Sequence, residues 1–235
     1  MKAMILAAGR GERMRPLTDS APKPLLAVAD KPLIQYHIES LVAAGIQDIL
    51  VNLAWKGEMI REQLGHGEAF GARIAYSDEG DAALETGGGV FKALPLLGEK
   101  PFLVVSGDVW TDYPFAKLAN VLMDSDVAHL IVVPNPDFHT RGDFALQGTR
   151  FVQEGARYTY ANIGVFRPQF FEECRPGKFA LAPLMFSWIA RNRVSGELFE
   201  GGWRNVGTPE QLKLLDSELR STHLSSGALH IRPSA

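Results

Sequence analysis

The chain has 235 residues, of which 46% are hydrophobic and 22% charged, and its formal net charge is −3. These values are typical of a soluble globular protein, and without a strongly basic balance a nucleic-acid partner is not expected. The single cysteine, Cys174, excludes an intrachain disulfide and favours a reducing, cytoplasmic compartment. No run approaches the roughly 20 apolar residues of a membrane span, and the apolar run at the N-terminus is too short for a secretory signal.

The first 135 residues alternate between short apolar runs and segments with apolar residues spaced by three and four. The runs predict strands over residues 3–8, 48–53, 73–76, 101–105 and 129–133. The spaced segments predict helices over residues 33–42, 57–64, 87–97 and 115–122. In the first helix Asp30 is a candidate cap, Pro32 lies in the first turn and Gly45 follows the end. Such alternation is typical of a mostly parallel sheet covered on both faces.

After residue 134 the predicted strands become short and are separated by turns that contain glycine. We expect strands over residues 144–146, 150–152 and 158–166, and helices over residues 181–191 and 209–219. The predicted fold class is therefore α/β: a Rossmann-like mixed, mostly parallel sheet flanked by helices, with a small appended sheet. No Pro/Ser-rich linker divides the chain, so a single domain is expected over residues 1–225. A tail over residues 226–235 is expected to continue the fraying that begins after Ser221.

The loop after the first strand has the residue types that bind phosphate. Gly9 and Gly11 let the backbone approach phosphate oxygens. Positive charge comes from Arg10, Arg13, Arg15 and Lys23, and prolines on both sides of Lys23 stiffen its segment. Because parallel strands joined by right-handed crossovers end at one edge of the sheet, this loop and the strand end at Asp108 are expected to converge there.

Two common phosphate-loop patterns fit this segment poorly. The pattern G-x-x-x-x-G-K-[ST] is absent, and Met14 occupies the third glycine position of G-x-G-x-x-G. An NAD-dependent oxidoreductase is therefore a weaker alternative, although Asp30 lies near the place of a ribose-binding acid.

The segment Leu6–Thr18, followed by Pro22–Leu25, resembles the signature of the sugar-1-phosphate nucleotidyltransferases, and the resemblance extends over residues 1–220. It implies a nucleotide-binding part over residues 1–135 and a sugar-binding part over residues 136–225. The implied catalytic residues are Arg15, Lys23 and Asp108. The implied nucleotide contacts are Ala8, Gly9, Gly11, Glu12, Arg13, Lys23, Gly80, Gly87 and Ser106.

Two further segments resemble the magnesium-binding motifs of that family. Gly107-Asp108 matches a Gly-Asp pair whose aspartate binds magnesium, and Gly201–Glu210 matches a later motif with one departure. Asn205 stands where the family has the second magnesium carboxylate. The resemblance therefore implies a Mg²⁺ cofactor held by Asp108 and Asn205. Because Mg²⁺ favours carboxylates, we expect weaker affinity than with two aspartates.

The segment Glu85–Gly89 resembles the bacterial N-acetylmuramate-1-phosphate uridylyltransferases of cell-wall recycling. Its glycines open a predicted helix, so bare amides at a positive helix end are expected to face a ligand. The resemblance implies magnesium-dependent transfer of a uridylyl group from UTP to a sugar 1-phosphate, with N-acetylmuramate 1-phosphate favoured. The alternatives are guanylyl or cytidylyl transfer to another sugar or alcohol phosphate, and a non-catalytic nucleotide-sugar sensor.

The sugar contacts implied by the resemblance are Glu85, Asp143, Glu154 and Asn162. Hydrogen bonds from such side chains to hydroxyls give selectivity. Many family members have a lysine for the sugar phosphate where this chain has Gly155, and Arg157 is a candidate replacement. Arg141 and Arg157 are candidates for a lactyl carboxylate. The expected partners are small molecules, with no nucleic acid or membrane, and the chain is expected to be a monomer or weak homodimer.

Overall fold

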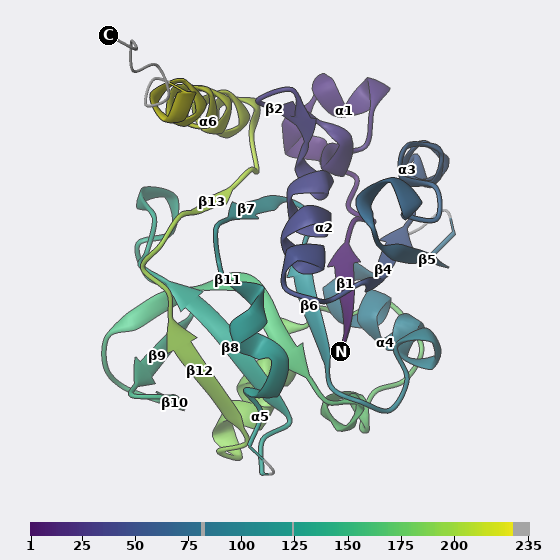
Figure 1. Cartoon of the computed structure of the whole chain (residues 1–235). Coiled ribbons are helices and arrows are strands. Elements are labelled where there is room, and N and C mark those ends of the chain that lie inside the picture. The colour runs from purple at the N-terminus through teal and green to yellow at the C-terminus, as the bar shows by residue number, and fades with distance from the viewer. Residues whose placement is uncertain (81–82, 124, 228–235) are drawn as a thin grey trace, which may run out of the picture.

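The computed structural model describes residues 1–80, 83–123 and 125–227, with side chains up to Thr222. Within these residues a nine-stranded sheet forms the centre, in the order β5-β4-β1-β6-β11-β8-β12-β10-β9 (Figure 1). The strands are β1 (Lys2–Leu6), β4 (Asp48–Leu53), β5 (Arg73–Asp78), β6 (Phe102–Ser106), β8 (Ala128–Val133), β9 (Phe144–Gln147), β10 (Arg150–Val152), β11 (Arg157–Phe166) and β12 (Val194–Leu198).

Helices cover both faces of this sheet. Because strand side chains alternate between faces, β1 contributes Ile5 to one core and Met4 to the other. The first core includes side chains of α2 (Leu33–Ala43), α3 (Gly57–Leu64) and the 3₁₀ helix η4 (Phe115–Asn120). The second includes side chains of α4 (Glu85–Leu97) and α5 (Ala182–Ala190). The predicted α/β fold class is confirmed.

The first half of the sheet is parallel, as predicted, because β4, β1 and β6 pair side by side in one direction. Leu6 lies opposite Ser106 in the β1–β6 register, so the loops after these strands leave from the same edge. The amide of Gly107 donates to the Leu6 carbonyl at 2.9 Å. A Cβ at Gly107 would lie 2.9 Å from that same oxygen, which explains the glycine before Asp108. The predicted convergence of the two loops is confirmed.

The second half joins the same sheet. β11 is antiparallel to both β6 and β8, between which it lies, and β12, β10 and β9 continue beyond β8. The strands expected in an appended sheet thus extend the main one, and β12 was not anticipated. The register of β11 on β8 shifts between Tyr160 and Ile163, where Asn162 has φ 58°. The division near residue 135 falls between β8 and β9, and as a domain division it stays a prediction.

Shorter elements surround the ends of the strands. A two-stranded sheet of β7 (Val109–Thr111) and β13 (Trp203–Asn205) follows Asp108, and a hairpin of β2 (Ala27–Val28) and β3 (Lys31–Pro32) precedes α2. The others are η1 (Glu12–Met14), α1 (Leu17–Ser20), η2 (Lys23–Leu25), η3 (Glu68–Phe70), η5 (Asp137–His139), η6 (Pro168–Phe171) and α6 (Pro209–Gly227).

Three local expectations are wrong. Asp30 does not cap α2, because it occupies the hairpin turn with φ 66° and pairs with Arg220 through two hydrogen bonds of 2.8 Å. The helix predicted over residues 115–122 is a 3₁₀ helix and ends earlier, at Asn120. α6 continues past Ser221 to Gly227, and the rest of the predicted tail, residues 228–235, lies outside the described residues. Over the part described, no helix is long and apolar enough to cross a membrane.

A third core joins the two ends of the chain. Met14, Val28 and Leu33 pack with Val206 and Leu215, and all five are buried. The backbone amide of Ala29 also donates to Asp216 Oδ1 at 2.7 Å, and α6 lies beside β2 in Figure 1. The segment after β1 is therefore held in place by its packing against α6.

Candidate active site

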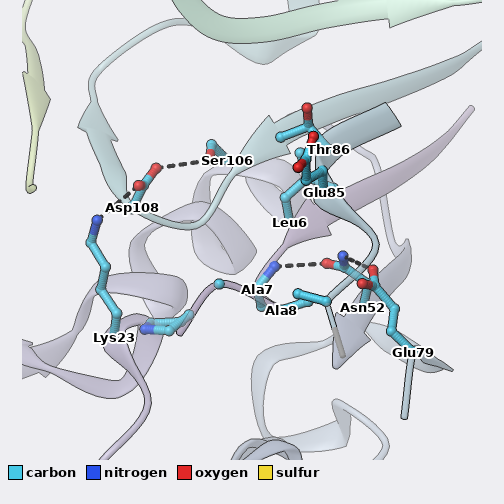
Figure 2. A pocket seen from close by; sticks show the side chains of 13 residues that line it. Leu6, Ala7, Ala8, Lys23, Asn52, Glu79, Glu85, Thr86, Ser106 and Asp108 are labelled. Carbon is cyan, nitrogen blue, oxygen red and sulfur yellow. Dashed lines mark hydrogen bonds and ion pairs between the residues drawn. The ribbon is translucent and has the colours of Figure 1, made fainter. Parts of the chain in front are cut away.

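A cavity of about 190 Å³ lies at the carboxyl ends of β1, β4, β5 and β6. Two groups of polar side chains stand on opposite sides of it, with Ala7 and Ala8 between them (Figure 2). It is lined by Leu6, Ala7, Ala8, Gly9, Lys23, Pro24, Asn52, Glu79, Ala83, Glu85, Thr86, Ser106 and Asp108. The predicted residues Ala8, Gly9, Lys23, Glu85, Ser106 and Asp108 thus share one cavity.

Lys23 and Asp108 form an ion pair at one side of this cavity (Figure 2). Lys23 Nζ donates to Asp108 Oδ2 at 2.8 Å, and Ser106 Oγ donates to Oδ1 at 2.7 Å. Burial alone would raise the pKa of Asp108, but the Lys23 ammonium and the Ser106 hydroxyl outweigh it and hold that pKa below its usual range. The cavity therefore holds a carboxylate and a cation whose side chain is only 9% exposed.

The position of Lys23 follows from its close packing against the glycine loop. Pro22 and Pro24 are buried on either side of it. Gly11 has φ 65°, and a Cβ there would lie 3.0 Å from Thr18 Cγ2 and 3.3 Å from Lys23 Cβ. Thr18 Oγ1 also donates to the Gly11 carbonyl at 2.8 Å. Gly11 therefore brings the loop and η2 together but is not part of the cavity wall.

Met14 explains why the third position of the glycine pattern holds no glycine. Its side chain is fully buried in the third core and anchors η1. Gly9 is exposed, and a Cβ there would meet nothing within 4 Å. The loop is thus fixed at its far end, while its first turn faces the cavity.

The three arginines of the loop after β1 do not line the cavity. Arg15 is exposed and pairs with Asp19 at 3.3 Å, and Arg10 stacks over the Trp55 ring at 4.7 Å. The Arg13 guanidinium lies near Gly207, where a Cβ would be 3.4 Å from Nη2. Arg13, Arg15 and Glu12 do not line the cavity, so their predicted contacts with a nucleotide stay predictions.

Asn205 lies next to Asp108 because β13 pairs with β7. Asn205 is opposite Val109 in this register, and the amide of Val206 donates to the Asp108 carbonyl at 2.8 Å. In the described part of the chain, no three His, Cys, Asp or Glu side chains are grouped to hold a metal ion. A carboxylate and a neutral amide oxygen suit a hard cation such as Mg²⁺ only if other oxygens complete its shell. Asp108 and Asn205 therefore fit a cation whose remaining ligands include phosphate oxygens.

His37, on α2, supports the strand after Asp108. Its ring is buried, and Nε2 donates to the Val109 carbonyl at 2.7 Å. Burial lowers the pKa of His37 to about 4, so the ring is neutral at pH 7.

The glycines that open α4 have a packing role. The amides of Gly87 and Gly88 both donate to the Phe179 carbonyl at 3.0 Å. A Cβ would lie 2.5 Å from the Phe179 ring at Gly87 and 2.3 Å from the Gly177 carbonyl at Gly88. The expectation of bare amides is therefore wrong at these two glycines, because residues 177–180 occupy them.

Gly87 and Gly80 are both outside the cavity wall. The amide of Gly80 donates to Asp78 Oδ1 at 2.8 Å, and the next two residues lie outside the described part. Glu85, with φ 61°, and Thr86 do line the cavity. The nucleotide contacts predicted for Gly80 and Gly87 stay predictions.

Asn52 and Glu79 are two polar residues of the cavity that the sequence analysis missed. Asn52 Oδ1 accepts from the Ala7 amide at 2.7 Å, and Asn52 Nδ2 donates to Glu79 Oε1 at 2.6 Å. Part of the signal was present, because Asn52 stands near the end of the strand predicted over 48–53, and Glu79 follows β5, which runs two residues beyond its predicted end at Tyr76. The rule that linked Gly9 to Asp108 applies equally to them.

A second cavity, of about 370 Å³, contains two of the four predicted sugar contacts, Asp143 and Asn162, and also Asn205. The Asp143 carboxylate accepts from the Tyr160 amide at 2.8 Å and lies 3.0 Å from His139 Nε2. The remaining wall is largely aromatic and apolar: Phe138, Phe144, Thr159, Tyr160, Ala182, Met185, Phe186 and Trp203.

The other residues considered for the sugar lie outside this cavity. Glu154 is in an exposed turn between β10 and β11 and lines neither cavity. Arg157 Nη2 donates to the Asp143 carbonyl at 2.5 Å, and Arg141 is exposed. The structure therefore does not bring Glu154, Arg141 or Arg157 to the second cavity, and their contacts with a sugar stay predictions.

The family model described as Nucleotidyl transferase matches residues 2–141. The chain belongs to this family. Over 221 residues it is 49% identical to the N-acetylmuramate alpha-1-phosphate uridylyltransferase of Neisseria meningitidis serogroup B, covering 91% of this chain and 96% of the relative. Over 223 residues it is 37% identical to the enzyme of the same name from Caulobacter vibrioides, covering 88% and 92%. The prediction of an enzyme of this family is confirmed.

Solved structures support the fold. A Bacillus anthracis protein described as a glucose-1-phosphate thymidylyltransferase, solved with sucrose, superposes with a TM-score of 0.84 at 21% identity, covering 100% of this chain and 98% of that one. HddC from Yersinia pseudotuberculosis, solved with GMP-PN, gives a TM-score of 0.74 at 19% identity, covering 93% and 99%. At these identities the likeness establishes the fold alone.

Proposed function

We propose that this enzyme transfers a uridylyl group from UTP to N-acetylmuramate 1-phosphate and releases pyrophosphate, in cell-wall recycling. The observation that carries this proposal is the Lys23–Asp108 pair, which stands in the first cavity next to Asn205 of the second. The names of the 49% and 37% identical relatives support the choice of nucleotide and sugar.

In this proposal the two cavities hold the two substrates. The triphosphate lies against Ala8 and Gly9, and the sugar lies in the second cavity near Asp143 and Asn162. An oxygen of the sugar phosphate attacks the α-phosphorus in line, a new P–O bond forms, and the bond to pyrophosphate breaks. Because the attacking group is already an anion, no general base is required. Positioning and charge neutralisation are then the main tasks of the protein, and Lys23 supplies positive charge at the point of transfer.

Asp108 and Asn205 would together hold the proposed Mg²⁺, which supplies further positive charge to the phosphates when bound. The low pKa of Asp108 keeps its carboxylate ionised and ready to act as a ligand. Asn205 can offer one neutral oxygen, so phosphate oxygens and water must complete the shell. The predictions of a cytoplasmic location, of a monomer or weak homodimer and of no nucleic-acid partner accompany this proposal.

A substrate panel tests the proposal. The purified chain is mixed with Mg²⁺, one of the four nucleoside triphosphates and one of several sugar 1-phosphates, and pyrophosphate release is measured. We expect the highest kcat/KM for UTP with N-acetylmuramate 1-phosphate. A higher value with GTP or CTP, or with another sugar phosphate, would replace the proposed substrates, and no release with any pair would contradict the proposed activity.

A further inference from the structure

We infer that Asn52 and Glu79 form a latch that holds the phosphate loop and the entry to α4 at a fixed separation, and so sets the affinity for the nucleoside triphosphate. This inference rests on the proposed function for the identity of the ligand. It assigns a positioning role to two residues that stand across the cavity from the Lys23–Asp108 pair (Figure 2).

The latch is a continuous chain of hydrogen bonds between three strand ends and a helix start. The Ala7 amide, just after β1, donates to Asn52 Oδ1 at 2.7 Å. Asn52 Nδ2, on β4, donates to Glu79 Oε1 at 2.6 Å. Glu79 Oε2, just after β5, accepts from the Leu84 amide at 2.6 Å, immediately before α4. The loop that begins at Ala7 is thereby joined to the cavity residues Glu85 and Thr86.

Burial makes this chain of bonds costly to break. Asn52 is 3% exposed and Glu79 is 8% exposed, and a buried polar group that loses its partner is strongly unfavourable. Helix α4 has a glycine, Gly89, next to the Glu79 carboxylate. A larger residue would not fit there, because a Cβ would lie 2.5 Å from Glu79 Oε1 and 3.0 Å from Asn52 Nδ2. Gly89 therefore makes room for the Glu79 and Asn52 side chains, whereas Gly87 and Gly88 make room for residues 177–180.

The pattern of donors and acceptors allows only one arrangement. Both groups facing Glu79, the amide of Asn52 and the backbone amide of Leu84, are donors. In a Glu79→Gln variant, the new NH₂ group faces either the Asn52 amide or the Leu84 amide, whichever way the side chain is turned. Two hydrogen-bond donors then face each other. Asn52→Asp puts two carboxylates in contact within a buried site. Each single substitution therefore breaks the latch with little change in size.

The double substitution Asn52→Asp/Glu79→Gln restores the arrangement with its polarity exchanged. The new carboxylate accepts from the Ala7 amide and from the new side-chain amide, whose oxygen accepts from the Leu84 amide. Charge and shape return to those of the original pair. Rescue by this exchange would trace the loss to the Asn52–Glu79 contact itself, and the separate readings of KM and Tm distinguish positioning from stability.

The experiment compares the two single variants, the double variant and two exposed controls, Glu62→Gln and Asn120→Asp. KM for UTP, KM for the sugar 1-phosphate and kcat are measured, together with Tm in the absence and presence of saturating UTP. We expect each single variant to raise KM for UTP about tenfold or more, with KM for the sugar phosphate within about twofold of the original. The double variant is expected to return KM for UTP to within about threefold of the value for the unaltered chain. The two control variants are expected to leave both KM values and kcat unchanged.

Three outcomes would overturn the latch: single variants with lowered Tm but unchanged KM for UTP, equal rises in both KM values, or a double variant no better than the worse single one. If the unaltered chain gains Tm with UTP but releases no pyrophosphate, the proposed activity fails. The latch is then judged by the same exchange, with the Tm gain of each variant as the readout. If UTP gives neither a Tm gain nor turnover, the inference fails with the proposed function.

Discussion

The two cavities of this enzyme are built in different ways. The first lies at the ends of parallel strands, and its polar side chains are already paired across short distances, as in Lys23–Asp108 and Asn52–Glu79. The second lies where β11 changes register, and aromatic rings form much of its wall. Of these rings, Phe138 is 55% exposed and Phe186 is 50% exposed. The first cavity is thus held in shape by hydrogen bonds among its own side chains, whereas the second offers mainly apolar surface; in the proposed function these are the nucleotide side and the acceptor side.

The largest expected effect concerns the cation of the first cavity. Lys23→Ala removes charge from the point of transfer, and the loss of one such group typically lowers turnover by about 100-fold or more. Lys117→Ala, on the exposed surface of η4, is the matched control. Steady-state pyrophosphate release gives kcat, and near-normal turnover in the Lys23 variant would remove Lys23 from the catalytic residues.

Acid should lower the free energy of unfolding through His37. The unfolded chain protonates this ring near pH 6.5 but the folded chain only near pH 4, so protons favour unfolding in between. Stability is complete above pH 6.5 and falls by about 3 kcal/mol as the pH drops to 4. Urea unfolding at a series of pH values measures this loss. His37→Gln should flatten the dependence, whereas the exposed His66→Gln should leave it unchanged.

The shape of the acceptor side is tested with Phe186→Ala. We expect KM for the sugar 1-phosphate to rise about fivefold, corresponding to about 1 kcal/mol of lost apolar contact, with KM for UTP unchanged. The exposed Leu96→Ala, on α4, serves as the control. A rise in KM for UTP alone would reverse the assignment of the two cavities.

The smallest effect concerns the residue between the cavities. Asn205→Asp adds a charged oxygen next to Asp108, so half-maximal turnover should need a few-fold less Mg²⁺. A Mg²⁺ titration at saturating substrates measures this, and an unchanged midpoint would argue that Asn205 is not a ligand.

The sequence predicted the regular part of the fold well. An apolar run located β4, and apolar residues spaced by three and four located α3, each with the observed bounds. The rule for parallel strand ends placed Gly9 and Asp108 at one edge, and both line the first cavity. Asn52 and Glu79 lay within reach of the same rule. Their hydrogen-bond partners, the backbone amides of Ala7 and Leu84, could not be predicted in this way. A hydrogen bond between a side chain and a distant amide leaves no periodic signal in the sequence.

The errors came from contacts between distant segments. The amides of Gly87 and Gly88 were expected to be open, but residues 177–180 return to cover them, and no local pattern reports this. Asp30 looked like a helix cap because its partner, Arg220, is 190 residues away. β11 lies in the main sheet, between β6 and β8. The pattern of a short strand predicts that a strand forms but does not predict which strands it pairs with.

The third core has a consequence for synthesis of the chain. The loop that contains Met14 leaves the ribosome early, yet Val206 and Leu215, which pack against it, are made only after the nine strands of the central sheet. The bond from Ala29 to Asp216 spans 187 residues, and at about 5–20 residues per second this corresponds to a delay of roughly 10–40 s. A nascent chain therefore cannot complete the third core, which packs against the loop after β1, until α6 has emerged from the ribosome.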